Sequence, residues 1–171
     1  MKKLYLIAVA LVFTAISINA QGTLAFEKGY RGNISLGGNI SVTKGWLSNS
    51  VELTTSHGYC FGDGMYVGGG VGIDINFRDY ASIPLFLDAK YNIMDWKLSP
   101  YIDCRMGMEL LYVDDTGIAF IASPGIGFDY RRLSFRFGYR CEAGRVNDWE
   151  NGPITTYFKL HTLSLSAAIN F

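Results

Sequence analysis

LHTLSLSAAINF, residues 160–171, alternates between apolar side chains and polar or small ones. The apolar set, read in steps of two, consists of Leu163, Leu165, Ala167, Ile169 and Phe171. The intervening positions carry Ser164, Ser166, Ala168 and Asn170. Successive side chains of a β-strand point to opposite faces, so this spacing predicts a strand with one apolar face.

The same alternation recurs along the chain, and no segment has a convincing helical period. The expected strands cover 33–42, 51–61, 65–77, 82–93, 101–111, 118–130, 133–142 and 160–171. Tight turns are expected at 62–64 and 131–132, and a longer polar loop at 143–153. Eight short strands at regular spacing predict an all-β sandwich or up-and-down barrel, and an even strand number suits a closed barrel.

Composition and the N-terminus narrow the class of protein. Hydrophobic residues make up 49% of the 171-residue chain and charged residues only 18%, which argues against disorder. The formal net charge of zero gives no indication of a nucleic-acid partner. Residues 1–20 contain two lysines, an apolar run and a small-residue end, which predicts a signal peptide cleaved after Ala20.

Ten charged residues fall on the polar face of the expected strands. They are Asp74, Asp88, Lys90, Asp103, Arg105, Glu109, Asp129, Arg136, Arg140 and Glu142. In a soluble sheet they would be solvated. A charge facing lipid at mid-membrane costs about 2–4 kcal/mol, so in a membrane barrel they would line the lumen, where acids and bases could pair. Periodicity alone does not separate these two interpretations.

Four features favour the membrane barrel. The apolar face runs for about ten residues per strand, enough to cross a bilayer at a tilt. The polar face carries many glycines, which leave room for large charged neighbours. The printed chain ends on the aromatic Phe171. Aromatic residues also gather near expected strand ends, as in interfacial girdles: Tyr59, Phe61, Phe77, Tyr91, Phe128, Tyr130, Tyr139 and Phe171.

Together with the leader, the stretches MYVGGGVGIDI, SIPLFLDAKYNI, SPGIGFDYRRLSFRFGY and LSLSAAINF resemble the small bacterial outer-membrane β-barrel family of OmpA/OmpX type. The resemblance covers nearly all of residues 30–171. It implies an eight-stranded antiparallel transmembrane barrel in the bacterial outer membrane. It also implies that Leu163, Leu165, Ala167, Ile169 and Phe171 form the signal read by the barrel-assembly machinery.

The expected organisation follows from this resemblance. Residues 1–20 are a signal peptide, 21–30 a short periplasmic segment and 31–171 the barrel. Connections near 43–50, 78–82, 112–117 and 143–154 would face outside. Those near 62–64, 94–99 and 131–132 would be periplasmic.

No specific catalytic, cofactor or metal-binding pattern is present in the sequence. His57 and His161 lie in the apolar register, where an interfacial role is expected. The GGGVG stretch at 68–72 is not followed by a helix, as phosphate binding would require. Cys60, Cys104 and Cys141 are odd in number and fall on strands that are not neighbours, so free thiols are expected.

The expected function is therefore an integral barrel with a largely plugged polar lumen, in contact with outer-membrane lipid. Its role would be structural, or surface contact with an extracellular ligand of unknown identity, or slow passage of small solutes. An eight-stranded barrel has just enough interior space for side chains. Two alternatives stay open: a membrane-embedded barrel enzyme or small-ligand transporter, and a secreted soluble barrel of lipocalin type.

Overall fold

A computed structural model describes residues 24–42, 49–76, 80–112, 116–148 and 154–171. A short 3-10 helix, η1 (Leu24–Phe26), precedes eight strands. The strands are β1 (Gly29–Ser41), β2 (Ser50–Cys60), β3 (Met65–Asn76), β4 (Tyr80–Asn92), β5 (Leu98–Tyr112), β6 (Thr116–Tyr130), β7 (Leu133–Asp148) and β8 (Ile154–Asn170). The expected signal peptide lies outside the described residues. None of the helices described is long and apolar enough to cross a membrane.

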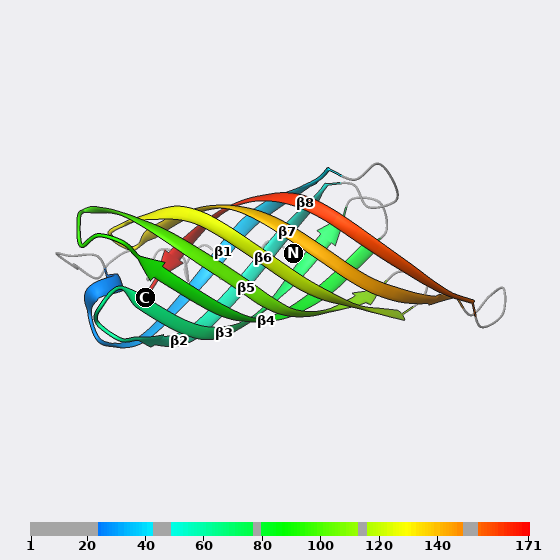
Figure 1. The fold of residues 1–171 in the computed structure, drawn as a ribbon, viewed down its shortest axis with the longest axis horizontal. Coiled ribbons are helices and arrows are strands. Elements are labelled where there is room, and N and C mark those ends of the chain that lie inside the picture. Colours follow the sequence, from blue (N-terminus) through cyan, green and yellow to red (C-terminus); the bar gives the residue numbers. More distant parts are fainter. Residues whose placement is uncertain (1–23, 43–48, 77–79, 113–115, 149–153) are drawn as a thin grey trace, which may run out of the picture.

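The strands form a closed antiparallel barrel in sequence order, β1 to β8, and β1 pairs with β8 to complete it. Every neighbouring pair is antiparallel, so the topology is the expected up-and-down meander. Figure 1 shows the strands inclined to the long axis, as closure of a barrel requires. The strand number and order predicted from alternation are confirmed.

The two ends of the barrel differ. We call the end with Phe171 and the connections 61–64, 93–97 and 131–132 the terminal end, and the opposite one the loop end. The turn predicted at 62–64 is confirmed: Gly62 and Gly64 have φ of 90° and 88° in the connection between β2 and β3. Arg131 has φ of 55° in the two-residue turn between β6 and β7.

The prediction of a polar loop at 143–153 is wrong for its first half. β7 continues to Asp148 and β8 begins at Ile154, six residues before the expected start. Ala143 pairs with Lys159 and Asn147 with Thr155, so the main-chain ladder holds this stretch of β7 extended. The neighbouring strand β1 ends at Ser41, which pairs with Thr162 of β8. The β7–β8 hairpin therefore extends past β1 at the loop end, as Figure 1 shows. β1 itself begins at Gly29, just before the expected barrel start.

The apolar face of each strand points outward and the charged face inward. Leu87 is 70% exposed and Leu165 67%, whereas Asp129 is fully buried. This arrangement is the opposite of the one that a lipocalin-type soluble barrel requires, where the interior is apolar and the exterior charged. The outer wall is therefore suited to lipid, and the polar core is the barrel interior.

The aromatic residues are distributed less evenly than the sequence suggested. Exposed rings gather at the terminal end: Tyr30, Tyr59, Phe61, Tyr91, Phe128, Tyr130, Phe135 and Phe171. Tyr139 is not at a strand end, because the extension of β7 places it near the middle of that strand. Phe77 lies outside the described residues. At the loop end, Tyr112 and Tyr157 are exposed.

Candidate functional site

The candidate site is the charged interior. All ten charged residues singled out in the sequence lie on inward-facing strand positions and are buried or nearly so. Even Lys90 and Arg105, the most accessible of them, expose only 10% and 13% of their side chains. The interior contains two further charged residues, Arg31 and Glu52. Both residues continue the polar register: Arg31 precedes Gly32, and Glu52 lies between Val51 and Leu53. A stricter application of the alternation would have placed them among the predicted interior charges.

Asp129 is the centre of a cluster near the terminal end. Lys90 Nζ lies 2.7 Å from Asp129 Oδ1, and Arg31 Nη2 lies 3.2 Å from Oδ2. Asn92 Nδ2 and Ser134 Oγ also donate to this carboxylate, at 2.9 and 2.5 Å. These donors come from β1, β4 and β7, and Asp129 itself lies on β6. Side chains from four strands therefore meet at one buried acid. The Lys90 ammonium also lies 3.7 Å from the centroid of the Tyr101 ring, a cation–π contact.

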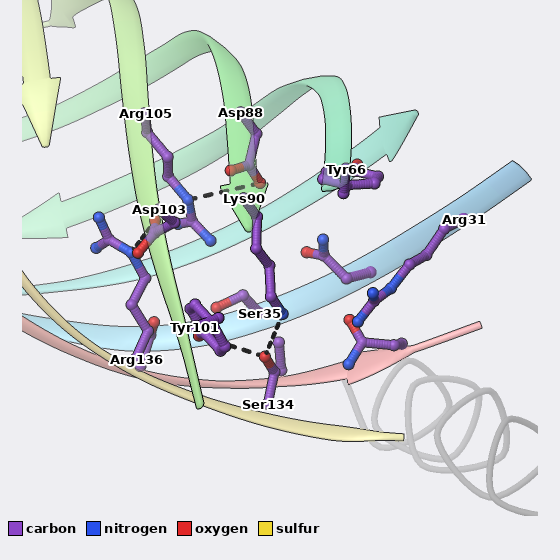
Figure 2. A pocket seen from close by; sticks show the side chains of 14 residues that line it. Arg31, Ser35, Tyr66, Asp88, Lys90, Tyr101, Asp103, Arg105, Ser134 and Arg136 are labelled. Atoms are coloured by element: carbon purple, nitrogen blue, oxygen red, sulfur yellow. Dashed lines mark hydrogen bonds and ion pairs between the residues drawn. The ribbon is translucent and has the colours of Figure 1, made fainter. Parts of the chain in front are cut away.

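Arg136 and Arg105 occupy the middle of the bore. Arg136 Nε pairs with Asp103 Oδ2 at 2.6 Å, and Arg136 Nη2 donates to the Ser123 carbonyl at 2.7 Å. Arg105 faces Asp88 at 3.8 Å and lies over the Phe86 ring. Figure 2 shows Arg105 directed toward Asp88 and Arg136 toward Asp103. Two cations from β5 and β7 are thus held by acids on β4 and β5.

Arg140 forms the third cluster, toward the loop end. Its Nη1 lies 2.5 Å from Glu52 and 3.4 Å from Asp74, and its Nη2 lies 2.6 Å from Glu109. Its Nε lies 2.8 Å from Glu142 Oε1, close enough for an ion pair but misaligned for a hydrogen bond. Ser82 also donates to Glu109. One guanidinium therefore contacts four carboxylates.

These side chains fill the bore. Two cavities among them, one near the terminal end and one near the middle, each have about 20 Å³, room for about one water molecule. The side chains in Figure 2 line the first of them. Inward glycines make the packing feasible, as the sequence predicted: a Cβ added at Gly125 would lie 2.8 Å from Arg136 Nη2. The arrangement is thus suited to filling a lumen rather than to opening a wide channel.

The histidines stand apart from these clusters, whereas the buried Cys60 thiol accepts a hydrogen bond from Arg31 Nη1 at 3.8 Å, at the edge of the Asp129 cluster. His57 and His161 lie on the outer wall, where His57 bonds to Tyr30 and Thr55, and His161 to Tyr139. Cys60, Cys104 and Cys141 are free thiols, as predicted. In the part of the chain that the structure describes, no group of three or more His, Cys, Asp or Glu residues could hold a metal ion.

The five residues assigned to assembly share the outer face of β8 and its end. Leu163, Leu165 and Ala167 are exposed, Ile169 is half-buried and Phe171 is 39% exposed. The Phe171 ring lies against Gly32 and meets the His57 ring edge-on, with centroids 6.1 Å apart. The last residue is thus part of the seam between β8 and β1.

Comparison with known proteins supports the fold. No protein-family model and no curated protein matches the chain. Solved structures do match it, among them the following three. Neisserial surface protein A (NspA) is 15% identical with a TM-score of 0.52, over 83% of this chain and 96% of that one. A de novo designed transmembrane β-barrel is 15% identical with a TM-score of 0.53, over 82% and 95%.

The third solved structure is the N-terminal β-barrel domain of Pseudomonas aeruginosa OprF. It is 14% identical with a TM-score of 0.51, over 88% of this chain and 100% of that domain. At such identities the likeness concerns the fold. The chain therefore has the fold of the small eight-stranded outer-membrane barrels of OmpA/OmpX type.

Proposed function

We propose that this protein is an integral barrel of the bacterial outer membrane whose polar lumen is plugged by its own ion pairs, with a structural or surface-interaction role. The observation that carries the proposal is the inverted distribution of polarity. Buried charges are paired inside, and the wall that faces outward is apolar. Residues 1–20 would direct export, and the loop end would face the cell exterior.

Membrane insertion is tested by two variants with equally exposed starting residues. Leu87 is 70% exposed on the wall of β4, and Trp96 is 65% exposed in the connection 93–97. In a membrane barrel Leu87→Arg costs about 2–4 kcal/mol at mid-membrane, whereas Trp96→Arg near the interface costs about 0–1 kcal/mol. The free energies of unfolding in urea, measured in lipid vesicles, should differ accordingly.

Equal stability of these two variants would contradict a lipid-facing wall. Fractionation of cells provides a second readout: the protein should be found in the outer membrane and should migrate faster on a detergent gel when unboiled. A protein wholly in the soluble periplasm would refute the proposal.

The plugged lumen is tested by conductance. Cavities of about 20 Å³ leave no room for a hydrated ion to pass freely, so planar bilayers with the purified barrel should show little or no steady current. A large and stable channel would contradict the plug. Small, brief openings would instead favour slow passage of small solutes through rearranged ion pairs.

We propose that the protein is not an enzyme. His57 and His161 lie on the outer wall, away from the interior charges. His57→Ala and His161→Ala should leave the cellular phenotype of the wild type intact. Loss of the phenotype in a variant that still inserts would favour a membrane-embedded enzyme.

The barrel-assembly machinery is the partner that we propose for the last strand. The exposed apolar positions of β8 provide an accessible face for recognition before the seam closes. Outer-membrane lipid is the second proposed partner.

A further inference from the structure

The outer wall has two charged side chains among the described strand residues, Arg145 on β7 and Lys159 on β8. The other outward positions of the strands described are apolar, small or uncharged polar residues, apart from the two histidines. Two cations on an otherwise uncharged wall need an explanation, since a random surface would mix both signs of charge.

These two cations are neighbours. Arg145 lies opposite Tyr157 and Lys159 opposite Ala143, so Arg145 and Lys159 are diagonal partners across the β7–β8 pair. Diagonal positions on one face are about 7–8 Å apart, within reach of long side chains. Neither cation has an ion-pair partner among the described residues. Like charges placed this way repel, and an anion between them removes the repulsion.

An apolar groove of about 660 Å³ adjoins the two cations. Its outward-facing lining consists of Ile118, Phe120, Ala143, Arg145, Tyr157 and Lys159. Tyr157 is 77% exposed and Phe120 54%, and both residues line the groove. The groove thus combines an apolar floor with a cationic rim, which matches an amphiphile that carries a negative headgroup.

The depth of the site fits such a ligand. Arg145 follows Leu133, the first residue of β7, by 12 residues. At about 3.3 Å per residue and a tilt of about 45°, this distance spans roughly 28 Å of the wall, just beyond an apolar band about 25 Å tall. Ile118 pairs with Arg145, and Phe120 lies two residues closer to the terminal end, opposite Ala143. Lys159 lies ten residues from Ile169, the partner of Leu133, which is roughly 23 Å by the same measure. The two cations therefore lie on either side of the edge of the band, where long basic side chains reach the headgroups, and the groove runs from there toward the terminal end. The β7–β8 hairpin that carries them projects at the loop end (Figure 1).

We propose that this groove binds one phosphorylated lipid of the outer leaflet, with the phosphate between Arg145 and Lys159 and an acyl chain along Ile118, Phe120 and Tyr157. The inference rests on the proposed membrane location. It assigns a specific lipid site to one hairpin rather than general contact of the wall with lipid.

The test uses the full-length mature barrel in a zwitterionic detergent and native mass spectrometry. Dioleoylphosphatidic acid is the probe, and dioleoylphosphatidylcholine and inorganic phosphate are the comparison ligands. One variant combines Arg145→Gln with Lys159→Gln. The matched control combines Lys28→Gln with Lys97→Gln, which removes two exposed cations at the terminal end.

We expect the wild type and the control to retain one phosphatidic acid, and the Arg145/Lys159 variant to bind it about thirty-fold more weakly. Phosphatidylcholine should bind no more tightly to the wild type than to the variant. Inorganic phosphate should not displace the lipid, because it makes no contact with the groove.

An equal loss in the control, or an unchanged affinity in the Arg145/Lys159 variant, would overturn the proposal, as would full displacement by inorganic phosphate. The heat-shift assay on the same samples separates this result from the proposed function. If the variant migrates as a folded barrel and binding is unchanged, the lipid site is refuted while the membrane barrel stands.

Discussion

Phe171 and Gly32 pair across the seam where β8 meets β1. The Phe171 amide donates to the Gly32 carbonyl at 2.9 Å, and the Gly32 amide donates to the main-chain oxygen of Phe171 at 2.8 Å. The absence of a side chain at Gly32 leaves space for the aromatic ring, since a Cβ there would lie 2.6 Å from Phe171 Cε2. Phe171 thus extends the β1–β8 seam with both its backbone and its ring.

Gly32→Val should displace the Phe171 ring and destabilise the barrel. The valine would occupy the position of the ring, and loss of the aromatic contact with His57 costs about 0.5–1.5 kcal/mol. Urea unfolding in vesicles measures the change. Gly38→Val is the control, because Gly38 lies on the same face of β1 and a Cβ there meets only Ser50 O, at 3.8 Å. Comparable destabilisation of both variants would show that the ring contact is not responsible.

Phe171→Asp, or deletion of Phe171, should reduce insertion into the outer membrane several-fold. The aromatic ring would be lost from the seam and from the face proposed for the assembly machinery. Phe61→Asp is matched to it, because Phe61 is also an exposed aromatic residue at the terminal end. The amount of heat-shifted protein in membranes is the readout. If both aspartate variants insert equally well, the terminal position has no special role in assembly.

Arg140→Met should destabilise the barrel by about 3–5 kcal/mol, because it leaves Glu52, Glu109 and Glu142 without their shared cation. Methionine keeps much of the side-chain volume, so the charge is the main change. Adding Glu109→Gln and Glu142→Gln to Arg140→Met should restore part of the loss. Unfolding in urea measures all three proteins, and a lack of rescue would indicate that packing rather than charge compensation dominates.

Gly138→Val should destabilise the barrel by about 1–3 kcal/mol, the usual cost of overpacking. Gly138 faces inward, and a Cβ there would collide with the Arg136 guanidinium and lie 2.6 Å from Ser164 Oγ. Gly69→Val serves as the control on the outer face, where a Cβ meets only Phe86 O at 3.8 Å. The thermal midpoints of the heat-shifted forms should separate the two variants. A thermal midpoint of Gly138→Val equal to that of the wild type would mean that the Arg136 side chain can move aside without loss of stability.

The orientation of the strand residues could be predicted well from the sequence. Alternation has a period of two residues and is a local property, so it placed Leu165 and Arg136 on opposite faces without knowledge of any partner. The length of the apolar runs, the inward glycines and the aromatic residues then favoured the apolar face as the outer wall. The same logic extends to Arg31 and Glu52, which were missed because one precedes the expected strand and the other stands in a less regular stretch.

The extent of β7 and β8 could not be predicted in this way. The stretch 143–148 contains Gly144, Asn147 and Asp148, which are typical of turns. Its extended form depends on the ladder to β8, where Gly144 pairs with Phe158 and Asn147 with Thr155. A strand that projects beyond the apolar band has no need of a continuous apolar face, so the hydrophobic pattern fades while the strand continues.

The sequence by itself determined that eight amphipathic strands alternate apolar and charged faces, because that pattern depends only on the chirality and pleat of each strand. Only the tertiary structure decided which charges meet. Arg31 on β1 reaches Asp129 on β6, and Arg140 on β7 reaches Glu52 on β2, and neither pair lies on neighbouring strands. Such partners are set by the register and diameter of the closed barrel, which bring side chains together across the bore and which no local stretch of sequence encodes.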